Sequence, residues 1–275
     1  ADYRIGFKWW ALIIAVVFVI SELVCVVCVP ERPVACDEKP GKISDMFKAL
    51  FKNDQAMTVV VSIILVYTSL NICGNLVLYF FRFDVGNEGA YSIFAAVAFA
   101  AQVLVMMVIP LLRKRFSKSQ LFISGFIIQI AGFAVILIMA FAKLYTPQSW
   151  YILCLPGILI YLGYGMLNVI MTIFLSDSVD YGEVMNGTRE ESVIFSMQTF
   201  TVKLASGVAV FLAGLVVDWI HLDTAAAVQT QDTLDALRMW MTIPSVILLI
   251  VGIFVFKRFY KLDDTRMEEI KSKLN

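Results

Sequence analysis

Seven apolar runs, each about 20 residues or longer, constrain this chain more than any other feature of its sequence. A helix needs about 20 residues to cross a hydrocarbon core about 30 Å thick, and a span must satisfy its backbone hydrogen bonds internally. No alternating barrel pattern accompanies the runs. We therefore predict an all-α polytopic membrane protein with seven transmembrane helices near residues 9–29, 57–81, 91–112, 119–142, 150–176, 193–219 and 239–256.

The composition agrees with this class and argues against several functions. Hydrophobic residues make up 60% of the chain, and the mean hydropathy is +0.82. A formal net charge of zero gives no indication of a nucleic-acid partner. The pair Cys25 and Cys28 lies inside an apolar run and is interpreted as packing, not as a metal or redox site. With one histidine, His221, and no catalytic motif, we expect neither an enzyme nor a cofactor.

Basic residues predict the orientation of the helices. The regions after the first, third and fifth runs, together with the C-terminal tail, contain 16 of the 22 Lys and Arg residues. Such regions usually face the cytoplasm. We therefore expect a cytoplasmic C-terminus and an N-terminus outside, as if an odd number of spans preceded this chain.

A long polar linker divides the runs into one before it and six after it. Its apolar side chains recur at helical spacing and alternate with lysines, which predicts an amphipathic helix on the inner membrane surface with Ser44 as its N-cap: Ile43, Met46, Phe47, Leu50 and Phe51. Six spans after such a linker are typical of the second half of a two-bundle transporter. The expected divisions are a helix of a missing N-terminal bundle (1–30), a cytoplasmic linker (31–56), a six-helix bundle (57–256) and a cytoplasmic tail (257–275).

Two charged residues, Glu22 and Lys203, lie well inside the predicted spans, where burying a charge costs at least about 2.5 kcal/mol. Lys203 lies close to the midplane and shares a helical stripe with Thr199, with Gln198 on its flank. A cation beside hydroxyl and amide groups suits a hydroxyl-rich solute or a carboxylate. The alternative is a lysine that snorkels or pairs with an acid on another helix. Glu22 is either a proton carrier or a buried neutral or paired carboxyl.

Two further polar stripes follow single helix faces. Both are compatible with a wet central cavity and equally with hydrogen bonds that hold helices together. They consist of Asn71, Asn75 and Tyr79 in one span, and of Tyr161, Tyr164, Asn168 and Thr172 in another.

The acidic segment LSDSVDYGEVMNGTREES follows the fifth run and is predicted to be cytoplasmic. If the helix continues beyond the membrane, Asp177 and Asp180 share one stripe, and Gly182 and Asn186-Gly187 are possible turns. Such a stripe would pair with Arg or Lys of the missing half and hold the inner side closed. The alternative is a solvated helix end.

The run SDSVDYGEVMNGTREESVIFSMQTFTVKLASG resembles the signature of the glycoside, pentoside and hexuronide cation symporters of the major facilitator superfamily. The segment ERPVACDEKPGKISDMFKALFKNDQ extends the resemblance over nearly the whole chain. The matching positions are Asp177, Asp180, Tyr181, Gly182, Glu183, Gly187, Arg189, Ser196, Gln198, Thr199 and Lys203.

The resemblance implies a carrier in the bacterial inner membrane that moves a sugar or sugar acid together with Na⁺ or H⁺. It places Lys203 in a central cavity and Gln198 and Thr199 near the sugar, and it places the main cation site in the missing half. Some galactoside-using members have an aromatic residue where this chain has Asn168, which favours a hexuronide or pentoside over a melibiose-like substrate.

The candidate sites follow from both arguments. We expect substrate contacts from Lys203, Thr199, Gln198, Asn168, Asn71 and Asn75, and a cytoplasmic ion-pair gate from Asp177, Asp180, Glu183 and Arg189. The alternative function is a remnant or split membrane subunit that does not transport and needs a separate first half.

Overall fold

The computed structural model describes residues 3–28, 51–187, 191–226 and 228–274. The chain forms two units, residues 1–42 and 43–275, which we describe separately. The described residues are helical and contain no strand, and seven of their helices are long and apolar enough to cross a membrane. The expected all-α membrane fold with seven spans is thus confirmed.

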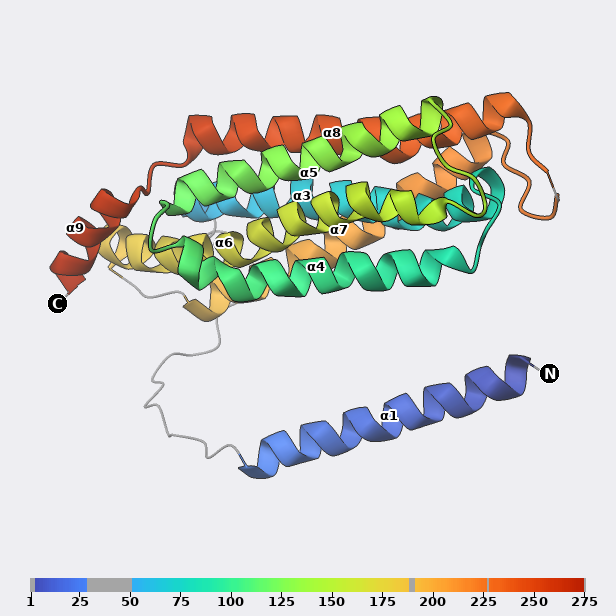
Figure 1. Cartoon of the computed structure of the whole chain (residues 1–275). Coiled ribbons are helices and arrows are strands. Elements are labelled where there is room, and N and C mark those ends of the chain that lie inside the picture. Colours follow the sequence, from blue (N-terminus) through green and yellow to red (C-terminus); the bar gives the residue numbers. More distant parts are fainter. Residues whose placement is uncertain (1–2, 29–50, 188–190, 227, 275) are drawn as a thin grey trace. The chain divides into compact units, whose positions relative to one another are not determined.

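Within the second unit, successive long helices alternate in direction along the chain (Figure 1). The first unit contains α1 (Tyr3–Cys28), whose Cys25 and Cys28 are both free thiols. The second unit contains α3 (Asp54–Tyr79), continued by a π-helical turn (Phe80–Asp84), then α4 (Ala90–Leu112), α5 (Lys118–Phe141), a 3₁₀ turn (Trp150–Leu153), α6 (Cys154–Asn186), α7 (Glu191–Trp219), α8 (Gln231–Phe259) and α9 (Asp264–Leu274). We call the end where α3 begins and α8 ends the α9 end of the bundle.

The predicted spans agree with these helices to within about four residues except at three ends. α1 begins six residues before 9, α6 continues ten residues past the predicted limit of 176, and α8 begins eight residues before 239. Most of the expected amphipathic linker, including Ile43, Ser44 and Leu50, lies outside the described residues, so the division of the chain at 31–56 stays a prediction.

Local sequence signals explain where several helices begin and end. Ser117 and Gln120 form a reciprocal capping box at the start of α5, with N–H to side-chain oxygen distances of 3.1 and 3.0 Å. The Asn53 side chain accepts a 2.9 Å hydrogen bond from the backbone N–H of Ala56 at the start of α3. α6 ends at Gly187, whose φ of +72° is the left-handed cap that favours glycine.

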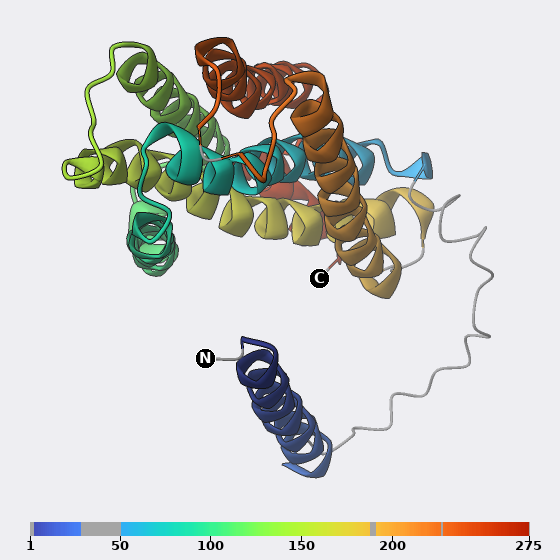
Figure 2. The same cartoon turned by 90° about the vertical axis from the view of Figure 1, so that its right-hand side faces the viewer.

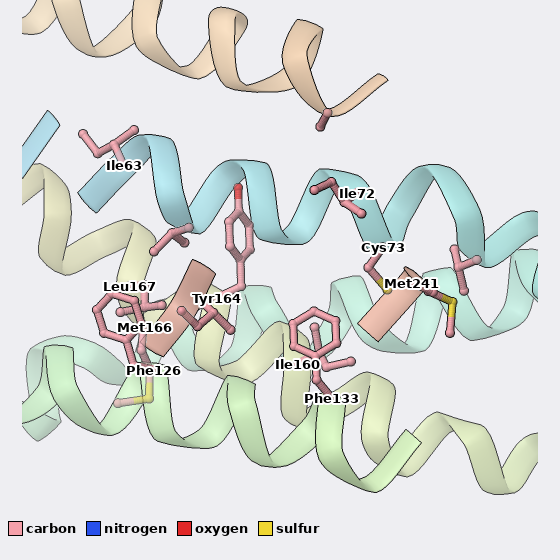
Figure 3. Packing of buried hydrophobic residues seen from close by; sticks show 14 of the residues in the cluster. Ile63, Ile72, Cys73, Phe126, Phe133, Ile160, Tyr164, Met166, Leu167 and Met241 are labelled. Carbon is pink, nitrogen blue, oxygen red and sulfur yellow. The ribbon is translucent and has the colours of Figure 1, made fainter. Parts of the chain in front are cut away.

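The bundle is organised around α3, which packs against α8, α7 and α6 (Figure 2). α6 packs in turn against α5 and α4, and α5 also contacts α8. Figure 3 shows how fully buried side chains of α5 and α6, among them Phe126 and Leu167, fill the space between these helices, and Ile63 of α3 is fully buried as well. One continuous core therefore runs through the second unit.

Close backbone approaches and one polar tie fix the helix pairs. A Cβ at Gly163 of α6 would lie 2.5 Å from the carbonyl oxygen of Gly125 on α5, so only glycine allows this contact. Ser69 and Ser245 donate to each other's backbone carbonyls at 3.1 and 2.8 Å, which joins α3 to α8. Small residues and hydroxyl hydrogen bonds are the usual means of association between membrane helices.

We expect Gly163→Ala to destabilise the bundle by about 1–3 kcal/mol, because the added methyl group must push α5 and α6 apart. Gly207→Ala is the matched control, since nothing lies within 4 Å of a Cβ built at that position. Thermal unfolding of the purified chain in detergent measures both variants. Equal stability of the two would contradict the contact between α5 and α6.

Candidate functional site

Lys203 lies near the middle of α7, on a face that does not pack inside the bundle. α7 packs against α3, and its buried residues recur at three- or four-residue spacing: Ile194, Met197, Thr201, Ala205, Ala209, Ala213 and Val216. Lys203 and Thr199 fall outside this stripe and are exposed, and Gln198 is half-buried. Among the residues that the structure describes, none forms an ion pair with Lys203. Lys203 is thus an exposed cation on the surface of the bundle.

A polar cluster joins α3 and α6. The amide of Asn168 donates a 2.6 Å hydrogen bond to the hydroxyl of Tyr67, and the Tyr67 and Tyr164 rings meet edge to face with centroids 5.5 Å apart. Tyr67 was not among the expected residues. The sequence could have indicated Tyr67, because this residue precedes Asn71 by four positions and so belongs to the same stripe of α3.

Asn71 and Asn75 behave differently from Asn168. Their amides donate to backbone carbonyls of α3 one turn earlier, Asn71 to Tyr67 and Asn75 to Asn71, both at 2.7 Å. Both side chains are half-buried. These hydrogen bonds remain within one helix. Asn168 therefore links two helices, whereas Asn71 and Asn75 do not.

Asn75 also lines a groove of about 410 Å³ between α3 and α7, together with Tyr79 and Asp218. Val210 of α7 is the lining residue nearest to Lys203 in the sequence. Seven residues separate the two, which corresponds to about 10 Å along a helix. The structure thus gathers the expected substrate residues on three packed helices, and it joins no asparagine of α3 or α6 to Lys203 by a described contact.

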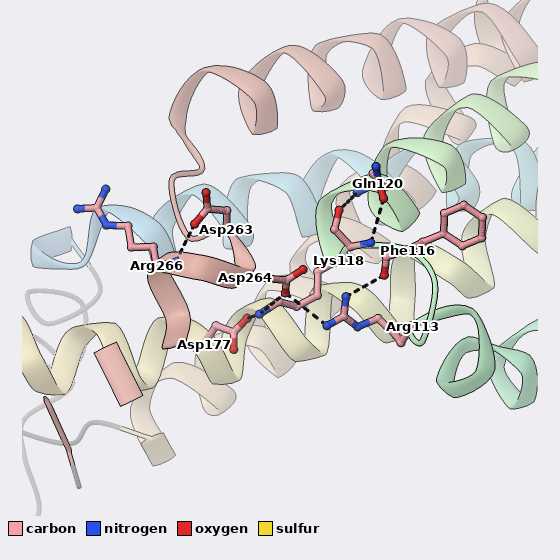
Figure 4. Close-up of polar contacts among 9 residues, drawn as sticks. Arg113, Phe116, Lys118, Gln120, Asp177, Asp263, Asp264 and Arg266 are labelled. Carbon is pink, nitrogen blue, oxygen red and sulfur yellow. Dashed lines mark hydrogen bonds and ion pairs between the residues drawn. The ribbon is translucent and has the colours of Figure 1, made fainter. Parts of the chain in front are cut away.

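The acidic segment continues α6 as a helix to Asn186, which is the condition under which Asp177 and Asp180 share one stripe. Asp177 is buried and forms an ion pair with Lys118, the first residue of α5 (Figure 4). We expected the charge partner of Asp177 to lie on a missing half. The structure instead pairs Asp177 with a lysine of the same bundle. The reason is that Lys118 is itself buried, with 7% of its side chain exposed, and needs a compensating carboxylate.

The other expected gate residues lie beyond this ion pair. Asp180 and Glu183 follow Asp177 on successive turns of α6 and are half-buried, and Arg189 lies outside the described residues. Gly182 makes no turn. It lies within α6, where a Cβ would meet the Asn53 amide nitrogen at 2.7 Å, and that amide donates to the carbonyl of Ser178 at 2.8 Å.

The tail helix α9 docks on this extension of α6. Leu262, Met267 and Ile270 form a small buried cluster against Tyr181 and Val184. A polar contact adds to it, because Asp264 lies 3.4 Å from both Lys118 and Arg113, as Figure 4 shows. The same lysine thus contacts α6 and the tail.

The carboxyl group of Asp264 titrates below its ordinary pKa of 3.8. Partial burial by itself would raise this pKa, but the charges of Arg113 and Lys118, and the hydrogen bonds that both residues donate, outweigh burial. Asp264 is therefore ionised at neutral pH and stabilises the docked tail.

A second buried ion pair lies at the opposite end of the bundle. Arg238 of α8 donates to both carboxylate oxygens of Asp84 at 2.8 and 2.5 Å, and the Tyr145 hydroxyl donates to Asp84 at 2.7 Å. Burial, and after it the charge of Asp84, raises the pKa of Tyr145 far above its ordinary value, so its hydroxyl remains a donor. Sequence reasoning missed this cluster because both charged residues lie at the edges of apolar runs.

Comparison with known proteins decides the family. Residues 3–264 match the family described as MFS/sugar transport protein. The chain belongs to this family. The resemblance to the symporters of the major facilitator superfamily that the motif around Asp177 and Lys203 indicated is thereby confirmed.

Three relatives align over 85% to 98% of this chain. It is 24% identical to the raffinose carrier protein of Pediococcus pentosaceus over 98% of this chain and 42% of that protein. It is 25% identical to the isoprimeverose transporter of Lactiplantibacillus pentosus over 94% of this chain and 52% of that protein. It is 25% identical to the uncharacterized symporter YjmB of Bacillus subtilis (strain 168) over 85% of this chain and 49% of that protein. The chain spans about half the length of these relatives.

We expect Lys118→Met to destabilise the bundle by about 3–5 kcal/mol, because Asp177 then remains buried without its lysine. The double variant Lys118→Met/Asp177→Leu should recover most of this loss, since an apolar pair removes both buried charges. Lys114→Met, at an exposed lysine in the same turn, is the control. Chemical denaturation followed by far-UV circular dichroism measures the series. A double variant as unstable as the single one would refute the pairing.

Acid should release α9. Because the folded-state pKa of Asp264 lies below 3.8, its contribution to tail docking is present above that value and is lost as the pH falls through the folded-state pKa. Hydrogen-exchange protection factors of the α9 amides, measured from pH 7 to pH 3, should show one loss of protection below about pH 4. Asp264→Asn should lower protection already at pH 7 and abolish the acid step. A step unchanged in this variant would assign it to another group.

Proposed function

We propose that this chain is the second half of a secondary transporter that moves a sugar or sugar acid together with Na⁺ or H⁺ by alternating access. The observation that carries the proposal is the exposed Lys203 in the middle of α7. An ammonium group at that depth is too costly to face lipid, so it faces water or another part of the transporter.

The residues around Lys203 suit the recognition of a sugar. Thr199 lies one turn away on the same exposed face, and Gln198 adds an amide on its flank. Hydroxyl and amide groups exchange hydrogen bonds with sugar hydroxyls, and an ammonium group attracts the carboxylate of a sugar acid. The half-buried Asn71 and Asn75, and Asn168 held by Tyr67, would extend this polar lining onto α3 and α6.

The proposal includes a first bundle that these residues do not contain. Alternating access requires two bundles that move against each other around a central site, and the chain spans about half the length of the relatives it matches. Those relatives carry the names of a raffinose carrier and an isoprimeverose transporter, which supports a saccharide as the substrate. We assign the main cation site to the first bundle and the whole protein to the bacterial inner membrane, with its C-terminus in the cytoplasm.

We further propose that the end of α6 belongs to a gate at the α9 end. The ion pair between Asp177 and Lys118 would hold the extension of α6 in place, and Asp180, Glu183 and Arg189 would contact the first bundle when this side closes. This assignment gives Asp177 a positioning role within the gate.

Lys203→Met in the protein encoded with its upstream region should lower sugar uptake by about 10- to 100-fold, because a hydrogen bond to a charged group contributes about 1.5–3 kcal/mol. Uptake of radiolabelled raffinose, xylose and glucuronate into proteoliposomes, under a Na⁺ or a pH gradient, measures the effect. Lys114→Met is the control for loss of a positive charge. Wild-type uptake by the Lys203→Met variant would remove this lysine from the mechanism.

The same assay separates the remaining parts of the proposal. Residues 1–275 alone should give no uptake, and uptake equal to that of the longer protein would show that a first bundle is not needed. Asp180→Asn should slow uptake and leave sugar binding unchanged, because a gate acts on the movement and not on the site. Undiminished uptake in this variant would exclude Asp180 from the gate. Absence of uptake by the longer protein under either gradient would favour a subunit that does not transport.

A further inference from the structure

A groove of about 410 Å³ lies between the beginning of α3 and the end of α8, and the transport proposal does not use it. Met57, Val61 and Val255 line the part nearer the middle of the two helices, and Phe51 and Phe259 line the part at the α9 end. Its size is within the range of sites that hold small ligands. In a membrane protein, an apolar groove on the outside of a helix pair faces lipid chains.

The end of the groove is basic. Lys261 lines it directly, and Lys257 and Arg258 are exposed in the last turn of α8. Arg258 follows Val255 by three residues, which places both on one side of the helix, and its guanidinium lies 5.6 Å from the centroid of the Phe259 ring. Within the part of the chain that the structure describes, no carboxylate pairs with these three cations.

One acidic residue also lines the groove. Asp54 is exposed at the start of α3, and its carboxylate already accepts a 2.8 Å hydrogen bond from the Gln55 amide. Lys52 precedes it by two residues and is exposed as well. The lining itself therefore carries one carboxylate and one ammonium group. In the adjoining exposed segments, the basic residues Lys52, Lys257, Arg258 and Lys261 outnumber the acidic residues Asp54 and Asp263, so the surroundings of the mouth are positive on balance.

The walls of the groove are fixed by a buried glutamine. Gln55 donates to the carbonyl of Phe259 at 3.3 Å and accepts from the backbone N–H of Lys261 at 2.8 Å. These contacts hold the end of α8 against α3 without any ligand. The groove is therefore formed before a ligand binds, and the free-energy cost of ordering the groove on binding is small.

We propose that this groove binds an anionic phospholipid. One acyl chain lies along Met57, Val61 and Val255, and the phosphate group faces Arg258 and Lys261. Basic pockets between membrane helices recognise anionic headgroups in this way, because Lys and Arg give charge-assisted hydrogen bonds to phosphate oxygens. A zwitterionic lipid has the same acyl chains and would make the same apolar contacts. The basic residues at the mouth of the groove therefore favour the anionic lipid over the zwitterionic one.

The test is native mass spectrometry of the purified chain in detergent, with equimolar phosphatidylglycerol and phosphatidylethanolamine of identical acyl chains. We expect about a 10-fold preference for phosphatidylglycerol, since each basic residue near a headgroup favours an anionic lipid. The variant Lys257→Gln/Arg258→Gln/Lys261→Gln should lose this preference. The matched control, Lys114→Gln/Arg115→Gln/Lys271→Gln, removes three exposed charges from the same end of the bundle and should keep it.

Two results would overturn the proposal. One is a wild-type chain without a preference between the lipids, and the other is an equal loss of preference in both triple variants, which would mean unspecific attraction. Val61→Trp supplies an independent reading, because it fills the groove and leaves every charge in place. It should lower the fraction of chains that carry either lipid, and wild-type binding by this variant would place the lipid elsewhere. Circular dichroism confirms that each variant is folded before it is compared.

Discussion

Helices in hydrocarbon gain nothing from hiding apolar side chains against one another, because lipid tails are as apolar as leucine. The arrangement of this bundle therefore depends on close contacts and on polar ties. Gly163 brings α5 and α6 to backbone contact, and the reciprocal hydrogen bonds of Ser69 and Ser245 join α3 to α8. The phenylalanines of the core fill the space that these contacts define.

The two ends of the bundle are held by buried ion pairs. Asp177 with Lys118 joins α6 to α5 at the α9 end, and Asp84 with Arg238 joins the end of α3 to α8 at the other. Such pairs are favourable only when both partners remain in place. Each pair is closed within the bundle and needs no residue from outside it. The face of α7 that carries Lys203 is exposed.

The sequence predicts the spans well because their signal is local. A run of about 20 apolar residues has to become a helix wherever it meets a membrane. Asp177 and Asp180 have helical spacing, and α6 does continue through both of them to Asn186. Gly187 likewise ends this helix as its conformational freedom suggests. These inferences need no knowledge of the neighbouring helices.

The pairing of charges was harder to predict because it depends on distant residues. Lys118 belongs to a basic turn that indicates orientation, and nothing local shows that it turns inward to meet Asp177, 59 residues later. Arg238 and Asp84 are 154 residues apart. Gly182 illustrates the same limit, since its small size serves the approach of Asn53 and makes no turn. Tyr67 could have been predicted from the sequence, because it extends the helical stripe of Asn71 and Asn75 by one turn.

The contacts of Asp264 join residues that are synthesised at different times. Arg113, Lys118 and Asp177 all precede α8 in the chain, so both partners of the buried ion pair are synthesised before the tail. Asp264 follows the last span of the bundle. Docking of the tail therefore requires that all six spans have been synthesised, whereas the ion pair between α5 and α6 does not.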